Sequence, residues 1–197
     1  ILKAPEEFSQ ADYIIIESTY GNSLHDNATT TPDQLLEWIE KACVQRKGKL
    51  IIAAFSVGRT QAIIFTLHQL YREGKLPNIK IFTDSPLAIK TTRMYASHIS
   101  GLNDEAKEFY KTHGNLFSFP ELYTIENNND SKMISMMPEP AVIISAAGMV
   151  EGGRIDHAHH SGNAFRALTD TQQLAAAVQA ASRCLRAGVR PRCWSNQ

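Results

Sequence analysis

Runs of strand character alternate with helical patterns through residues 31–145, and this alternation constrains the fold more than any other feature. β-branched and other apolar residues fill the runs 50–55, 79–83 and 141–145. Between the first two runs, residues 59–73 repeat apolar side chains at helical spacing and stop at Gly74. The pattern predicts an α/β fold: a mostly parallel, Rossmann-like sheet flanked by helices.

Capping signals predict further helices on either side of these strands. A hydroxyl followed by proline marks a helix start, as does an asparagine before a helical pattern. The predicted starts are Thr31-Pro32, with Leu35, Ile39, Ala42 and Cys43 on one face; Ser85-Pro86, with Leu87, Met94 and Tyr95 at helical spacing; and Asn103, in a helix that ends at Gly114. Residues 131–137 are expected to form a short helix after a surface loop at 127–129.

The charge balance and the cysteine content indicate which binding partners and which cellular compartment to expect. Lys plus Arg equals Asp plus Glu at 20 each, so no overall field attracts nucleic acid and anion binding must come from local geometry. Three widely spaced cysteines fit reduced thiols in a cytoplasmic protein. No apolar run approaches the ~20 residues that cross a bilayer, so no membrane partner is expected.

The two ends of the sequence differ from the middle. The chain begins with Ile1, from which we expect a fragment of a longer protein. After Asp156 the composition changes: no Lys follows Lys132, no acidic residue follows Asp170, and five of the ten Arg lie from Arg166 onward. A shifted reading frame, a fusion or a disordered native tail would each explain residues 157–197.

Three predicted strands end in small or hydroxyl residues just before a helix, at residues 55–60, 83–86 and 145–148. In a parallel sheet, ligands bind beyond the carboxyl ends of the strands, where helix N-termini present free N–H groups. These loops are therefore candidates for binding phosphate. Their candidate residues are Ser56, Gly58, Arg59, Thr60, Ser85, Ser145, Gly148, Gly152, Gly153 and Arg154.

Each of these loops also has a purely structural interpretation. Hydroxyl residues before helices are usually N-caps, and glycines after strands are usually turns. Three such loops together, two of them followed by an arginine, favour a phosphate-rich ligand. None of them matches GxGxxG or GxxxxGK[ST], so the ligand is not expected to be a common nucleotide.

Four segments resemble a known family in order and spacing: "DYIIIESTYGN" (12–22), "AAFSVGRTQ" (53–61), "DSPLA" (84–88) and "IISAAGMVEGGRI" (143–155). They are similar to the β-CASP branch of the metallo-β-lactamase-fold RNA-processing nucleases. The resemblance covers about residues 1–156. It implies a strip of metallo-β-lactamase domain at 1–22, a β-CASP domain at 23–156 and an atypical tail at 157–197.

The resemblance also implies a function. In that family two zinc ions in the metallo-β-lactamase domain activate a hydroxide, and the β-CASP domain forms a lid over RNA. Glu17 matches an acidic residue that orients an essential histidine, although a carboxylate capping the loop after the strand at 13–16 is the simpler reading. The expected partners are RNA, the rest of the metallo-β-lactamase domain and a possible second copy of the chain.

Departures from the family pattern matter for activity. The zinc-ligand signature HxHxDH and the later family histidines do not occur in this sequence, so the chain alone is expected to bind no zinc and to be inactive. Ala62 stands where relatives commonly have Glu. Asp156, His157 and His160 would share a helix face, but a solvated histidine cluster is the commoner outcome.

Two other functions remain open. A catalytically silent module that binds RNA or a protein within a processing complex would use the same loops. The other alternative is a dinucleotide-dependent α/β enzyme. The sequence argues against it, because no acidic residue lies ~20 positions after a glycine fingerprint.

Overall fold

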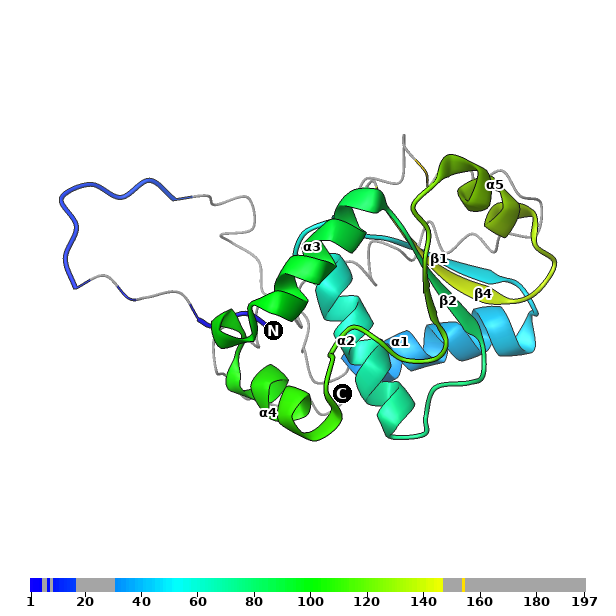
Figure 1. Cartoon of the computed structure of the whole chain (residues 1–197), viewed down its shortest axis with the longest axis horizontal. Coiled ribbons are helices and arrows are strands. Elements are labelled where there is room, and N and C mark those ends of the chain that lie inside the picture. The colour runs from blue at the N-terminus through cyan, green and yellow to red at the C-terminus, as the bar shows by residue number, and fades with distance from the viewer. Residues whose placement is uncertain (5–6, 8, 17–30, 147–153, 155–197) are drawn as a thin grey trace, which may run out of the picture.

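The computed structural model describes residues 1–4, 7, 9–16, 31–146 and 154 (Figure 1). Within this part of the chain no helix is both long and apolar enough to cross a membrane. The elements follow in the order α1 (Thr31–Ile39), the π-helix η2 (Glu40–Gln45), β1 (Lys49–Ala53), α2 (Arg59–Arg72), β2 (Lys80–Asp84), α3 (Pro86–Ser97), the 3₁₀-helix η3 (Ile99–Gly101), α4 (Asp104–His113), β3 (Leu122–Thr124), α5 (Asn128–Met136) and β4 (Ala141–Ser145).

The strands form one four-stranded sheet in the order β1-β4-β2-β3, and every neighbouring pair is parallel. The last strand, β4, lies between β1 and β2, and Ser145 is in register with both Ala53 and Asp84. This confirms the predicted parallel α/β sheet. Because the strands are parallel and in register, the ends of β1, β2 and β4 lie at one edge of the sheet.

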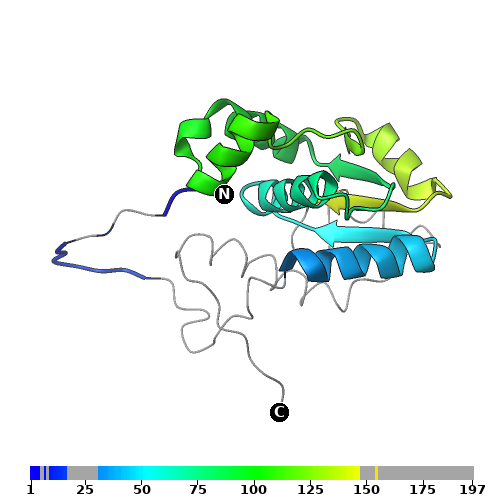
Figure 2. The same ribbon diagram turned by 90° about the horizontal axis from the view of Figure 1, so that it is seen from below.

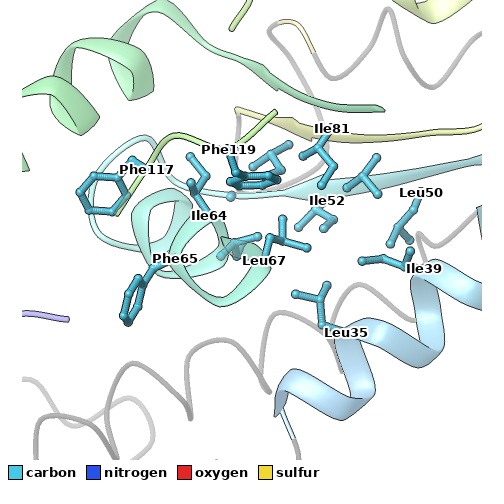
Figure 3. Close-up of a cluster of buried hydrophobic side chains, with 14 of the residues drawn as sticks. Leu35, Ile39, Leu50, Ile52, Ile64, Phe65, Leu67, Ile81, Phe117 and Phe119 are labelled. Carbon is cyan, nitrogen blue, oxygen red and sulfur yellow. The ribbon is translucent and has the colours of Figure 1, made fainter. Parts of the chain in front are cut away.

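Helices cover both faces of the sheet. Leu50, Ile52 and Ile144 point to one face, where they pack with Leu35 of α1 and Ile64 of α2 (Figure 3). On the other face, Ile51, Phe82 and Ile143 pack with Ile134 of α5. Figures 1 and 2 show α5 on the opposite side of the strands from α1. Burial on both faces explains why the strands lack polar alternation.

Most predicted helix positions are confirmed. The residues predicted to share one helix face are all buried: Leu35, Ile39, Ala42 and Cys43. Burial also raises the pKa of the Cys43 thiol to about 11, so this thiol stays protonated. The predicted caps also hold: the Ser85 side chain accepts from the amide of Ala88, the Asn103 side chain accepts from the amide of Ala106, and Gly114 ends α4.

The helix predicted from Ser85-Pro86 is confirmed as α3; it buries Ala88, Ile89 and Thr91 and leaves Leu87 and Met94 59% and 64% exposed. The prediction for residues 127–129 is wrong, and one strand was missed. Residues 127–129 are not a loop, because the Asn127 side chain accepts from the Asp130 amide and starts α5 at Asn128. The short edge strand β3 was not predicted, since three residues are too few to show a period.

The apolar segment Tyr13–Ile16 is not a strand in the structure. Its side chains are 76% to 103% exposed, and no described strand pairs with it. A lone extended segment has no hydrogen-bonding neighbour, and it forms a strand only beside another. The segment therefore exposes four consecutive large apolar side chains, which is unusual for a solvated surface.

His68 of α2 is the buried histidine of the described core. It is 4% exposed, and its Nδ1–H donates to the carbonyl of Leu116 over 2.9 Å. Its ring lies 5.2 Å from the ring of Phe119 in a stacked arrangement. Burial lowers the pKa of His68, because the charged imidazolium loses its hydration.

The fold is therefore expected to lose stability in mild acid through His68. A histidine whose pKa is lower in the folded state protonates first in the unfolded state, so stability falls as pH drops below ~6.5. We expect His68→Phe to lose less of its free energy of unfolding between pH 7.5 and 5.5 than the parent chain does, measured by urea unfolding. The exposed His98, changed to Gln, is the control; an unchanged loss in His68→Phe would contradict the assignment.

Candidate nucleic-acid interface

The three predicted loops meet at the carboxyl edge of the sheet. The hydroxyls of Ser56, after β1, and Ser85, after β2, lie 3.1 Å apart. The hydroxyl of Ser145, at the end of β4, donates to the carbonyl of Asp84 over 3.3 Å. We call residues 55–60, 84–86 and 145 the rim.

Gly58 gives the first rim loop its shape. Its φ of 81° lies in the left-handed region, which glycine adopts without a steric penalty. Its amide donates to the side-chain oxygen of Gln61 over 2.7 Å, and the Gln61 amide nitrogen donates to the carbonyl of Ser56 over 3.2 Å. Gln61 is fully buried, so it fixes the loop from inside the protein.

Two helix N-termini point at the rim. Helix α2 starts at Arg59, after the loop that follows β1, and α3 starts at Pro86, with one residue between it and the end of β2. The N-terminus of a helix carries about half a positive charge, which attracts an anion. Some of the first amides are already paired within the protein: the Arg59 amide donates to the Val57 carbonyl, and the Ala88 amide donates to the Ser85 hydroxyl. The positive ends of both helix dipoles nevertheless lie at the rim of a chain that carries no net charge.

Arg59 supplies a cation at the same place. Its guanidinium lies 5.0 Å from the centre of the Phe55 ring, in a cation–π arrangement. Phe55 and Val57 are 51% and 60% exposed, so this loop presents apolar surface beside its charge. A charged group next to an exposed aromatic ring suits a strand with phosphates and bases.

Several predicted phosphate ligands are instead buried and bonded within the protein. The Thr60 hydroxyl donates to the carbonyl of Phe55, and Ser145 is 1% exposed. Ser85 is 6% exposed, and its hydroxyl accepts from the Ala88 amide. These three hydroxyls hold the loops in place, while Ser56, Gly58 and Arg59 are only half-buried.

Arg154 also lies at the rim, but its guanidinium is bound internally. Nη1 donates to Asp84 Oδ1 over 2.9 Å and to the carbonyl of Ile125, and Nη2 donates to the carbonyl of Glu126 over 2.6 Å. The side chains of Arg154 and Asp84 are 15% and 3% exposed. In this arrangement the Arg154 side chain is bound to the end of β2 and to the carbonyls that follow β3, in place of the predicted phosphate clamp.

Asp84 and Gln61 were missed as candidate residues. Asp84 accepts from Arg154 on one oxygen and from the Ser131 hydroxyl of α5 on the other, so it joins three segments. A carboxylate at the end of a buried strand must find a partner, and this signal was available in the sequence. For Gln61 the signal was its position three residues after Gly58, because a glutamine at that position of a helix start can accept from the backbone amide of the capping residue.

Other predicted residues lie outside the described part of the chain. They are Glu17, Gly148, Gly152, Gly153, Asp156, His157 and His160. Among the residues that the structure describes, no group of three or more His, Cys, Asp or Glu side chains could hold a metal ion. The described side chains therefore do not fit a zinc site.

Comparison with models of known protein families shows which family this chain belongs to. The Beta-Casp domain model matches residues 60–164, which is more than half of the 197 residues. The chain belongs to the β-CASP domain family. A model of alkaline phosphatase matches residues 148–188, of which the structure describes Arg154 alone.

Similar proteins carry names from RNA metabolism. The chain is 34% identical to an RNase J-like protein of Methanocaldococcus jannaschii over 79% of its own length, and 32% identical to a ribonuclease of Thermus thermophilus over 80%. It is 27% identical over 77% to the transcription termination factor FttA of Methanosarcina mazei. The chain spans 35%, 36% and 24% of these relatives, respectively.

The Asp84–Arg154 pair is expected to stabilise the rim. We expect Asp84→Asn to lower the free energy of unfolding by about 3 kcal/mol, because it leaves a largely buried guanidinium without its counter-charge. The exposed pair Arg93–Glu126 provides the matched control, and Glu126→Gln should cost below about 1 kcal/mol. Chemical denaturation measures both; equal small losses would contradict the role of Asp84.

Proposed function

We propose that this chain is the RNA-gripping lid of a zinc-dependent ribonuclease. Ser56 and Arg59 contact phosphates of the RNA backbone, Gly58 lets the backbone approach the loop without a side chain, and Thr60, Ser85, Ser145 and Arg154 hold the loops that carry them. Gly148, Gly152 and Gly153 let the RNA approach the main chain after β4. Contacts to phosphate position the RNA without reading its bases.

The main support for this proposal is that loops from different parts of the sequence meet at the rim. Ser56 and Ser85 come from loops 29 positions apart in the sequence, yet their hydroxyls are within hydrogen-bond distance. Two helix N-termini and the Arg59 side chain meet there as well. The family membership and the relatives named as ribonucleases support RNA as the anion.

The catalytic part lies elsewhere in the proposed enzyme. Zinc would be held by residues outside the described ones, since these offer no cluster of metal ligands. The apolar side chains of residues 13–16 are exposed, which supports a neighbouring part of the parent protein that covers them. We assign residues 1–22 to the metallo-β-lactamase domain, and the rest of that domain would be this neighbour. Glu17 follows residues 13–16 directly, and its proposed role is to orient an essential histidine supplied much later in the parent chain.

Substitution of Arg59 tests the grip on RNA. We expect Arg59→Ala to weaken the binding of single-stranded RNA by about 1–3 kcal/mol and to reduce its salt dependence, because a phosphate contact is lost. Arg72 lies at the other end of the same helix and is exposed, so Arg72→Ala is the matched control. Titration by fluorescence anisotropy at several salt concentrations measures both quantities.

The comparison of the two arginines can also reject the proposal. Equal affinity and an equal salt slope for Arg59→Ala and the parent chain would remove the phosphate role of the rim. A larger effect from Arg72→Ala would place RNA at the opposite end of α2.

Substitution of Glu17 tests the catalytic assignment in the full-length parent protein. We expect Glu17→Gln to lower the rate of RNA cleavage by at least tenfold while leaving RNA affinity within about twofold, because the amide cannot hold an imidazole as a carboxylate does. Single-turnover cleavage and binding assays separate the two effects. A parent protein that binds RNA without hydrolysing it would instead be the catalytically silent module.

A further inference from the structure

Large apolar side chains are exposed where the loops after β1 and β2 meet. They are Phe55 and Val57 of the first loop and Leu87 in the first turn of α3. The two loops touch through the hydroxyls of Ser56 and Ser85, so these three side chains come from neighbouring segments. Exposed apolar residues that occur singly are normal, whereas a group of them marks a binding surface. The rim therefore offers apolar surface that contacts to phosphate do not use.

Phe55 is the aromatic member of this group, and its main chain is firmly held. It follows six buried residues, 49–54, and is the first exposed residue after them. Its carbonyl accepts from the Thr60 amide over 3.3 Å and from the Thr60 hydroxyl over 2.9 Å. A ring on a fixed main chain loses little conformational entropy when a flat group binds to it.

Arg59 lies against one side of the Phe55 ring. Its guanidinium is 5.0 Å from the ring centre. A guanidinium stacked on an aromatic ring covers one of its two faces, and 51% of Phe55 remains exposed. The ring is therefore accessible to a second flat group.

The charge of Arg59 decides which partner suits this ring. An apolar protein surface that covered Phe55 would also take the neighbouring guanidinium out of water, which is costly without a counter-charge. A nucleotide supplies both parts, because its base stacks on the ring and its phosphate pairs with the guanidinium. The arrangement therefore favours a nucleic-acid strand over an apolar protein surface.

We propose that Phe55 is a stacking platform for one unpaired nucleobase and makes the rim select single-stranded over duplex RNA. This inference rests on the function proposed above and names the form of RNA that it takes. Within a duplex both faces of a base are stacked on its neighbours, so the ring is reached only by a base that is unpaired. Every base has a π-face, so the platform does not read sequence.

Titration of the 197-residue chain with a mixed-sequence RNA oligonucleotide, and with its duplex, tests the proposal. We expect Phe55→Leu to weaken binding of the single strand about five- to hundredfold, because the ring is lost while an apolar side chain remains. Duplex affinity should stay within about twofold, so the variant loses the preference for single strands. The salt slope should not change, because no charge is removed.

Two further measurements separate stacking from a purely structural role of Phe55. Phe55→Tyr keeps an aromatic ring and should bind the single strand as the parent chain does. In NMR spectra of the chain labelled in its phenylalanine rings, the Phe55 ring protons should move upfield with the single strand and not with the duplex, because a stacked base shields them.

Tyr110→Leu is the matched control. Tyr110 is also an exposed aromatic residue, but it lies on α4, outside the rim. This variant should bind both forms of RNA as the parent chain does. An unchanged affinity of Phe55→Leu for the single strand would overturn the proposal and leave the exposed ring to a contact with protein. Equal losses for single strand and duplex, or an equal loss in Phe55→Tyr, would also overturn it.

Comparison with Arg59→Ala separates this inference from the proposed function. If Arg59→Ala weakens RNA binding and Phe55→Leu does not, the stacking platform fails while the grip on phosphate stands. If Phe55→Leu weakens it and Arg59→Ala does not, the platform stands and Arg59 has no phosphate role. If neither variant changes RNA binding, both proposals fail.

Discussion

The pairing of β4 between β1 and β2 is the constraint on which the rest of the structure depends. It brings the last described strand into register with two strands that precede it by more than 50 residues, so that Ala53, Ser145 and Asp84 lie side by side. All three strands run in the same direction, and their loops therefore emerge at one edge. Without this pairing, the Ser56–Ser85 contact and the Asp84–Arg154 ion pair could not form together.

The same arrangement bears on the proposed function, in which a chain with no net charge binds an anionic polymer. In that proposal the attraction comes from the positive ends of the α2 and α3 dipoles and from the half-buried Arg59 rather than from an excess of basic residues. Behind the rim, the buried residues Gln61 and Asp84 hold the loops through partly buried hydrogen bonds. A site held in this way loses little conformational entropy when its ligand binds.

The sequence predicted what depends on local pattern. Apolar runs and caps located α2, α3, α4, β1, β2 and β4, because burial and capping leave a period or a signature residue. It could not predict that Arg154 turns inward to Asp84, since these residues are 70 positions apart and only the fold brings them together. For the same reason, no pattern distinguished the buried hydroxyls of Thr60 and Ser145 from the half-buried Ser56.

The central claim is that the rim at the carboxyl edge of the sheet binds the RNA backbone. Backbone amide NMR of the ¹⁵N-labelled chain during titration with single-stranded RNA tests it most directly. The account predicts that the largest shifts occur at Ser56, Gly58 and Arg59, with smaller ones at Ser85. Shifts concentrated instead at the amino edge of the sheet, around Lys47, Asn78 and Lys80, would contradict it.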